Sequence, residues 1–140
     1  ILIVGGGQET KMGTEMAANG VKCINAAGLF SVRASAALLS HCYAFIGLDT
    51  GTTHLASAVG TPCFAIYGER NNPGQWFPVG PNNMIVRHEV PCAGCRVFKC
   101  PVPGHPCMND IEPDSVWRQL QPFLQDGGTN IIDSPKLVSI

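Results

Sequence analysis

The stretch from residue 43 to residue 60 limits what this chain can fold into more than any other part of its sequence. Residues 43–48 form an almost continuous apolar run rich in β-forming residues, which is typical of a parallel strand buried on both faces. Polar residues end the run abruptly, and residues 52–59 then have the pattern of a short helix. Gly60 suits the C-terminal cap of that helix, and Pro62 blocks its continuation. This stretch therefore predicts a strand, a tight turn and a helix.

The turn between this strand and helix predicts a site for an anion. Gly51 can adopt backbone angles that are closed to other residues, and it would let a ligand approach the main chain. The first turn of the helix has unpaired N–H groups and the positive end of the helix dipole, both beyond the carboxyl edge of the sheet. The residues of this candidate site are Asp49, Thr50, Gly51, Thr52, Thr53 and His54. A simple capping role for the aspartate and the threonines accounts for the spacing equally well.

Strands and helices alternate along the chain, which predicts an α/β domain with a parallel sheet over residues 1–124. Predicted strands cover residues 1–4, 21–26, 43–48, 63–67 and 84–88, the last as an edge strand, and predicted helices cover residues 9–19, 32–40, 52–59 and 112–124. Ser31 is expected to cap the second helix, and Pro122 is expected to kink or shorten the last one. The tail, residues 125–140, is expected to have no fixed structure unless a partner surface orders it.

Two further segments suggest ligand contacts. The loop of residues 68–81 is rich in Gly and Pro and leaves the same sheet edge as Asp49, where open α/β sheets bind ligands. Its Trp76 could cover a ligand, although an anchoring role is favoured. Near the N-terminus, three glycines precede Glu9, but the G-x-G-x-x-G spacing of dinucleotide-binding turns is absent. Glu9 itself would be favoured at a helix start by the dipole.

Four of the seven cysteines fall in one loop of residues 92–107, which we call the cysteine-rich loop. Cys92, Cys95, Cys100 and Cys107 have the spacing C-x2-C-x4-C-x6-C. Three outcomes are open: a structural zinc ion, for which His105 could replace one thiolate, one or two disulfides, or unlinked thiols. A zinc or disulfide staple is favoured over unlinked thiols. The odd total and three isolated cysteines favour a reducing compartment.

Composition excludes several classes of function. The net charge is −1 and 14% of the residues are charged, so the chain offers no basic stripe for nucleic acid. No apolar run approaches the roughly 20 residues that a membrane span needs. Residues 1–4 lack the basic leader and cleavage site of a signal peptide, and they look instead like a strand in a chain cut from something longer. The expected location is the cytoplasm.

The string D-T-G-x-x-H-L-A-x-A-x-G-x-P, with the following apolar strand and Tyr67-Gly68, resembles glycosyltransferase family 9. This is the family of lipopolysaccharide heptosyltransferases, which use ADP-heptose as donor. Ala27-Gly28, residues 36–40 and residues 76–80 match further family segments, so the resemblance covers roughly residues 5–117. It implies the C-terminal, donor-binding half of a two-domain enzyme of the GT-B type, with a Rossmann-like parallel sheet and flanking helices.

The resemblance also implies roles for residues. The helix N–H groups with Thr50, Gly51 and Thr52 would hold the donor diphosphate, His54 would add a donor or partial charge, and Asp49 would orient the turn or a sugar hydroxyl. Glu9 matches an acidic residue that contacts the donor nucleotide, and the cysteine-rich loop would have a structural role. Relatives need no catalytic metal. Their catalytic base and acceptor site lie in the N-terminal half, so no catalytic residue is expected in this sequence.

The sequence departs from the family pattern in two ways, and three other functions remain possible alternatives to a transferase. Relatives often have Pro-Met where this chain has Thr52-Thr53, which leaves the choice of donor open. In relatives a further strand and helix precede the segment that matches residues 1–4, and that strand lies in the middle of the sheet; without it, residues 1–4 would form an exposed apolar edge. The rivals are a non-catalytic nucleotide-binding module, a module built on a four-cysteine metal site, and a sugar-nucleotide epimerase. If the transferase reading holds, a place at the inner face of the inner membrane, beside a lipopolysaccharide core acceptor, is expected.

Overall fold

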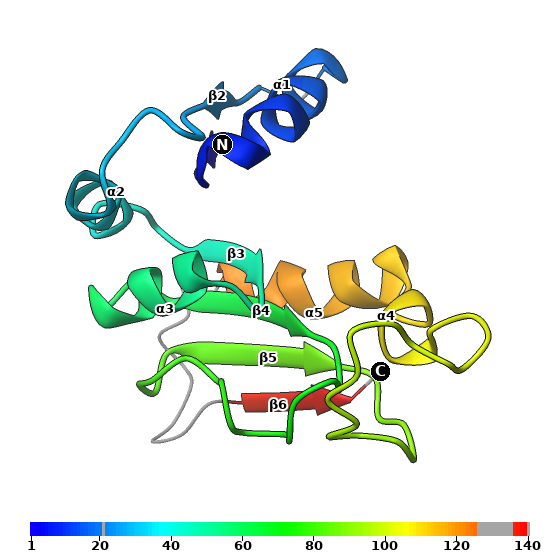
Figure 1. Cartoon of the computed structure of the whole chain (residues 1–140). Coiled ribbons are helices and arrows are strands. Elements are labelled where there is room, and N and C mark those ends of the chain that lie inside the picture. Colours follow the sequence, from blue (N-terminus) through cyan, green and yellow to red (C-terminus); the bar gives the residue numbers. More distant parts are fainter. Residues whose placement is uncertain (21, 126–135, 140) are drawn as a thin grey trace.

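The computed structural model describes residues 1–20, 22–125 and 136–139. Its main body is a four-stranded parallel sheet in the order β3-β4-β5-β6 (Figure 1). The strands are β3 (Phe45–Leu48), β4 (Cys63–Tyr67), β5 (Asn83–Arg87) and β6 (Lys136–Ser139). The helices of this body are α3 (Gly51–Ala58), α4 (Pro106–Asn109) and α5 (Pro113–Gln125). The predicted α/β class with a parallel sheet is therefore confirmed.

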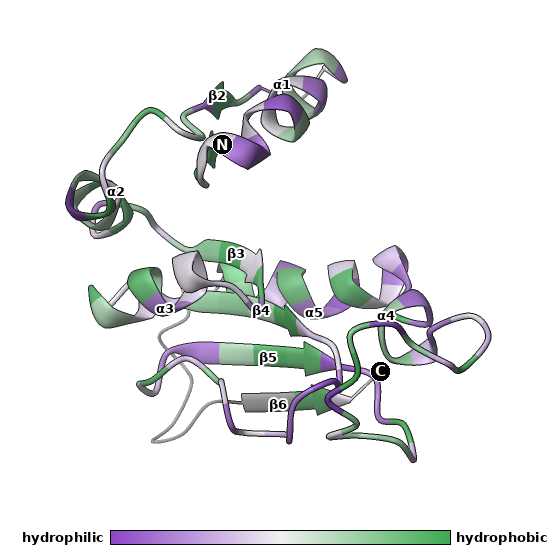
Figure 2. Ribbon diagram, viewed as in Figure 1, coloured by the Kyte–Doolittle hydropathy of each residue, from purple (hydrophilic) through white to green (hydrophobic). Residues whose placement is uncertain are grey.

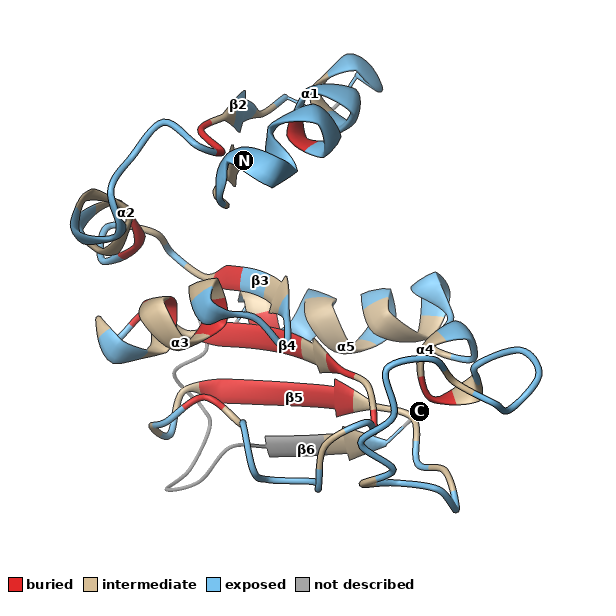
Figure 3. Cartoon of the chain, in the orientation of Figure 1, coloured by how far each residue is buried: buried red, intermediate tan, exposed pale blue. Residues whose placement is uncertain are grey.

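Alternation along β4 divides the core into two layers. Phe64 points to one face, where it packs with Met84, Val86 and Phe123 of α5, the two phenyl rings being 5.5 Å apart between centroids. Cys63 points to the other face, towards α3. Because β4 and β5 are covered on both faces, they are the most buried strands (Figure 3). All of β4 and the middle of β5 are apolar, whereas β5 begins and ends with a hydrophilic residue (Figure 2). Burying apolar surface on both faces is the main force that holds the sheet together.

A smaller N-terminal unit precedes this body. It contains β1 (Leu2–Ile3), the 3-10 helix η1 (Gly7–Glu9), α1 (Thr10–Ala18) and β2 (Ile24–Asn25). β1 and β2 pair in parallel as a separate two-stranded sheet. The helix α2 (Val32–Leu39) connects the unit to β3 (Figure 1), and the Oγ of its predicted cap Ser31 accepts a hydrogen bond from the N–H of Ala34 at 3.3 Å.

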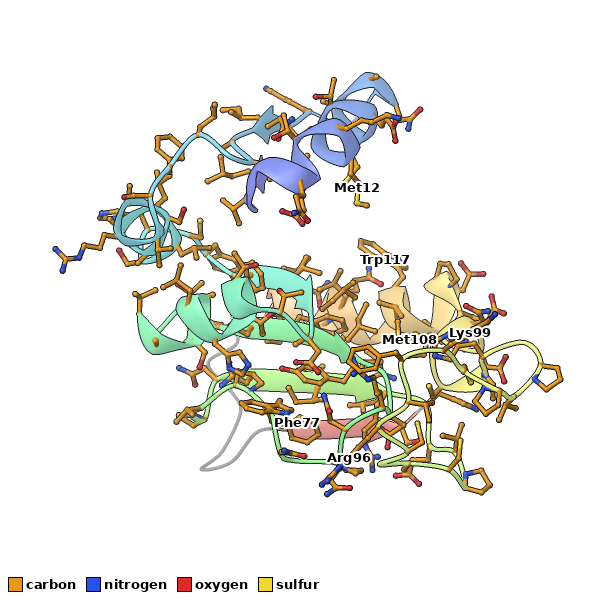
Figure 4. All side chains as sticks on the ribbon, in the orientation of Figure 1. Met12, Phe77, Arg96, Lys99, Met108 and Trp117 are labelled. Carbon is orange, nitrogen blue, oxygen red and sulfur yellow. The ribbon has the colours of Figure 1, made fainter. Side chains whose placement is uncertain are left out.

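The sequence predicts one sheet, whereas the described residues form two. Among them, β1 pairs only with β2, and β3 pairs only with β4. Both free edges carry exposed apolar side chains: Ile1 is 80% exposed, and Ile46 and Leu48 are each 50% exposed. The expected exposure of residues 1–4 holds for Ile1, while the three residues that follow are half-buried. In the same region Met12 of α1 extends towards Trp117 of α5 (Figure 4).

Two predictions at the C-terminal end are wrong. Residues 136–139 form a strand, and β5 is therefore an inner strand with β4 and β6 on its two sides. The physical reason is that β5 offers an open parallel edge, and Val138 packs against the apolar cluster around Phe64. The remainder of the predicted tail, residues 126–135 and 140, lies outside the described residues.

The prediction that Pro122 shortens the last helix is wrong, while a kink at Pro122 stays a prediction. α5 continues through Pro122 to Gln125. Pro122 and Arg118 are both exposed, so the carbonyl that loses its helical partner faces water and the cost stays small. In the part of the chain that the structure describes, no helix is both long and apolar enough to cross a membrane.

Candidate functional site

The predicted turn at the carboxyl end of β3 is present, and it leads directly into α3. The helix begins at Gly51, and Thr50 is its N-cap residue with an extended backbone, φ −140° and ψ 165°. The Thr50 side chain makes no capping hydrogen bond to the helix, and its Oγ1 lies 3.2 Å from that of Thr52. The first turn of α3 thus presents backbone N–H groups and two hydroxyl groups at the sheet edge. We call this group, from Asp49 to Thr52, the anion site.

The backbone angles of position 51 do not require a glycine, which corrects that part of the prediction. The φ of Gly51 lies outside the left-handed region, because it is the first residue of the helix. A Cβ at this position would meet no atom within 4 Å. The space above the main chain is therefore open, and the part of the prediction that concerns close approach of a ligand stays a prediction.

Thr53 is not placed to bind a ligand, which corrects the sequence prediction. It is fully buried, and its Oγ1 donates to the carbonyl oxygen of Leu48. Its own carbonyl accepts a contact from Sγ of Cys63 at 3.8 Å. Thr53 instead ties the start of α3 to the end of β3 and to β4, and so it fixes the turn that carries the anion site.

Asp49 links the anion site to the loop of residues 68–81. Its Oδ2 accepts a hydrogen bond from Nδ2 of Asn71 at 3.4 Å. Asp49 also helps to raise the pKa of Tyr67 above its usual value, although burial of the phenol is the larger cause. The Tyr67 hydroxyl donates to the carbonyl oxygen of Trp76 at 2.7 Å, and its ring packs edge-on against Phe77.

The loop is thus anchored through Phe77 and a backbone oxygen. The Trp76 side chain is 51% exposed, so it is not the anchor that the sequence predicts.

The other two residues that were predicted to contact the donor, His54 and Glu9, lie outside the group from Asp49 to Thr52. His54 is half-buried in the second turn of α3. Glu9 ends η1 in the N-terminal unit, where its side chain folds over the glycine turn: a Cβ on Gly6 would lie 3.1 Å from the Glu9 Oε2. That turn packs closely on Gly28, whose Cβ would lie 2.9 Å from the Cα of Gly7. Glu9 and Asp49 therefore belong to different sheets.

The four cysteines of the cysteine-rich loop are free thiols that line one cavity together with Asp49. Cys92 and Cys95 are exposed, Cys100 is half-buried and Cys107 is buried. Within residues 1–20, 22–125 and 136–139, no three His, Cys, Asp or Glu side chains are grouped closely enough to hold a metal ion. The donor set suits zinc chemically, but as it lies it does not fit the ion. Coordination would require the thiols to move together.

A buried ion pair that was not predicted from the sequence lies at the same sheet edge. Glu69 is 3% exposed, and its Oε1 accepts a hydrogen bond from Nη1 of Arg87 at 2.9 Å. Nη2 of Arg87 also donates to Oε1 of the exposed Glu89 at 2.6 Å. The sequence contains a pattern that could have indicated this pair. Glu69 follows β4 after one glycine and Arg87 ends β5, and neighbouring parallel strands end at the same edge of a sheet. The sequence alone does not tell that both charges turn inwards.

Comparisons with known proteins agree on one family. Residues 1–105 match the family described as "Glycosyltransferase family 9 (heptosyltransferase)". The chain is 32% identical over 104 residues to a lipooligosaccharide heptosyltransferase 2 of Haemophilus influenzae, which covers 73% of this chain and 30% of that protein. It is 28% identical over 92 residues to the protein of the same name from Campylobacter jejuni, which covers 63% of this chain and 28% of the relative.

Two solved structures share the fold. The structure of E. coli ADP-heptose lps heptosyltransferase II superposes with a TM-score of 0.68 at 23% identity, and a glycosyl transferase family 9 protein from Veillonella parvula with a TM-score of 0.75 at 21% identity. Each match covers 89% of this chain and 36% of the other chain. The chain therefore spans less than a third of these two curated relatives and a little over a third of the solved chains.

Proposed function

Because this chain belongs to glycosyltransferase family 9, we propose that it is the donor-binding part of a glycosyltransferase that transfers a heptose from ADP-heptose to a lipopolysaccharide core acceptor. The observation that carries the proposal is the anion site, at the carboxyl edge of a parallel sheet. This is where open α/β folds bind nucleotides. The named donor comes from the E. coli structure, and the acceptor class from the lipooligosaccharide enzymes that the chain resembles.

In this proposal the diphosphate of the donor lies against the first turn of α3. The N–H groups of Gly51 and Thr52 and the hydroxyls of Thr50 and Thr52 donate to its oxygens. When the bond from the sugar to the diphosphate breaks, negative charge grows on the leaving diphosphate, and these fixed donors stabilise it. His54 adds a further donor from the second turn, Asp49 orients a sugar hydroxyl, and Glu9 contacts the nucleotide.

No residue of this chain is proposed as the catalytic base. The base and the acceptor site belong to a second domain, as in the two-domain architecture that the family implies. We propose no metal for catalysis. The cysteine-rich loop is proposed as a structural element, stapled by zinc or by a disulfide, and the protein as cytoplasmic at the inner face of the inner membrane.

Replacing Thr50 with Val tests the anion site in the full-length protein that contains this chain. The substitution removes one hydroxyl and keeps the side-chain shape. We expect the affinity for ADP to fall about 2- to 10-fold, since one hydrogen bond is worth roughly 0.5–1.5 kcal/mol. Thr14→Val is the matched control, because Thr14 is an exposed threonine of α1 outside the anion site, whose Oγ1 donates to the carbonyl of Thr10 and accepts a hydrogen bond from Nδ2 of Asn25. Equal ADP binding by both variants, or no sugar transfer by the unmodified protein, would contradict the proposal.

A further inference from the structure

A cavity of about 240 Å³ lies at the carboxyl edge of the sheet, next to the anion site. Asp49 borders it on the side of the anion site, Glu69 and Asn71 line it after β4, and Cys95, Phe98 and Met108 border it opposite. Its volume is below the ~300–1,000 Å³ of pockets for drug-sized ligands. The cavity therefore suits one ring-sized group, and a whole nucleotide sugar does not fit in it.

The cysteine-rich loop is firmly joined to the rest of this cavity. The N–H of Gly94 donates to the carbonyl of Glu69 at 2.8 Å, and the N–H of Arg96 donates to the carbonyl of Arg70 at 2.9 Å. The guanidinium of Arg70 lies over the ring of Phe98, 4.1 Å from its centroid, which is close enough for a cation–π contact. These contacts make the loop a wall of the cavity.

The α4 helix contributes to the same wall, because Pro106, Cys107 and Met108 line the cavity. A Cβ on Gly68 would lie 2.8 Å from Sδ of Met108, so the helix packs directly against the main chain that leaves β4. A side chain at position 68 would push Met108 into the cavity or displace α4. The absence of a side chain at Gly68 thus allows α4 to pack close to the end of β4.

The polar groups of the cavity suit a ligand with hydroxyl groups. Glu69 is almost fully buried, and its Oε2 has no hydrogen-bond partner among the described residues. A buried acceptor without a partner is unfavourable by roughly 1–3 kcal/mol, which a donor on a ligand would relieve. Asp49 and Asn71 add a second carboxylate and an amide. Val97, Phe98 and Met108 supply apolar surface for the face of a ring.

We propose that this cavity holds the sugar of the donor, and that the cysteine-rich loop limits which sugar is accepted. The proposal rests on the function proposed above. It assigns the loop a role in specificity in addition to a structural one. With the diphosphate at the first turn of α3, Asp49 is the point where the anion site and the sugar cavity meet.

The test uses two pairs of variants in the full-length protein that contains this chain. Val97→Trp fills the cavity, and Val102→Trp is its control, because Val102 is in the same loop with the same 38% exposure but does not line the cavity. Glu69→Gln removes the acceptor charge, and Glu89→Gln is its control, because Glu89 binds the same arginine from outside the cavity. Calorimetric titration measures the Kd for ADP and for ADP-heptose.

We expect both cavity variants to weaken ADP-heptose binding at least about tenfold relative to their controls, with the Kd for ADP unchanged within about twofold. Equal losses for ADP and ADP-heptose would mean that the cavity takes the nucleotide, and unchanged binding of both would mean that it is not used; either result overturns the inference. If Glu69→Gln does not fold, the result for Val97→Trp tests the inference alone. We expect this variant to fold, because the larger side chain is added at a partly exposed position.

Transfer by the unmodified protein is measured in parallel. If the unmodified protein transfers sugar and the cavity variants bind ADP-heptose as well as their controls do, the proposed function is supported and the sugar cavity is rejected. Failure of the unmodified protein to bind either ligand would reject both.

Discussion

At the scale of single residues, two buried side chains hold the turn that carries the anion site. Thr53 and Cys63 are both fully buried, and each makes a hydrogen bond to a backbone carbonyl, Thr53 to Leu48 and Cys63 to Thr61 at 3.2 Å. Thr53 was predicted to be a ligand donor because it lies close in the sequence to three other polar residues, Thr50, Thr52 and His54. In a helix each residue is rotated about 100° from the last, so one of the four had to face the sheet. Composition does not reveal which one.

Replacing Thr53 with Val should therefore destabilise the protein. The carbonyl of Leu48 would lose its hydroxyl donor in a buried place, which costs roughly 1–3 kcal/mol. Thr53→Ser keeps the hydroxyl and is the control. Thermal melting should give a clearly lower Tm for Val than for Ser, and equal Tm values would show that the Thr53 hydroxyl does not hold the turn.

The thiol of Cys63 should make stability depend on alkaline pH. Burial raises its pKa from 9.0 to about 12, so in the folded protein it stays protonated in a range where the unfolded chain has lost the proton. The unfolded state then binds fewer protons, and the free energy of unfolding falls as pH rises from about 9 towards 12. Cys63→Ala should reduce this fall. Melting curves between pH 8 and 11 for both proteins check it, and parallel curves would contradict the assignment to Cys63.

At the scale of elements, sequence patterns predicted a strand most accurately where its apolar run has clear ends and is also buried in the fold. The β4 strand, Cys63–Tyr67, has the predicted ends, because its apolar run is bounded by Pro62 and Gly68 and is covered on both faces. The β6 strand was missed, because Lys136–Ser139 has few apolar residues and forms a strand only against the distant edge of β5. The cavity was missed for the same reason: its lining comes from three loops, and sequence spacing does not show how loops meet.

If β6 matters for the sheet, a charge at Val138 should be costly. Val138 packs against the cluster of Phe64, Met84 and Val86, so Val138→Asp would put a carboxylate into apolar surroundings. Val79→Asp is the control, because Val79 is 82% exposed. We expect a drop in Tm of several degrees for the first variant only. An equal Tm for both would restore the interpretation of residues 136–139 as a tail without structural weight.

The staple of the cysteine-rich loop stays a prediction from the sequence, because the structure has four free thiols there and a staple would require them to move together. Cys95→Ser should lower the Tm more than Cys42→Ser, because Cys42 is a lone cysteine outside the loop whose Sγ lies 3.4 Å from the carbonyl oxygen of Leu38. Metal analysis and thiol titration identify the staple as zinc or as disulfide. Four free thiols without zinc would reject it.

At the scale of the whole molecule, the division into two sheets leaves β1 and β3 each with one side unpaired among the described residues, in addition to the outer sides of β2 and β6. Unpaired edges with exposed apolar residues invite pairing with other chains. The chain also corresponds to less than a third of the two curated heptosyltransferases with which it was compared. Both observations lead to the same expectation for the isolated chain.

Residues 1–140 expressed alone should bind ADP weakly, associate, melt at a lower temperature than the full-length protein and transfer no sugar. Size-exclusion chromatography, thermal melting and a transfer assay beside the full-length protein measure this. A monomeric chain that melts cooperatively and transfers heptose would contradict the assignment as the donor-binding part of a larger enzyme.

The β6 strand pairs with β5 although a long segment of chain separates the two strands in sequence. Parallel neighbours need a long connection, so the β5–β6 pair closes a loop that contains the cysteine-rich loop and α5. Closing a long loop delays pairing, because chain entropy is lost before any contact forms. During synthesis on the ribosome β3, β4 and β5 emerge before β6, and the side of β5 that faces β6 has no partner until residues 136–139 have been made. Until β6 pairs with it, that side of β5 is open to pairing with other nascent chains.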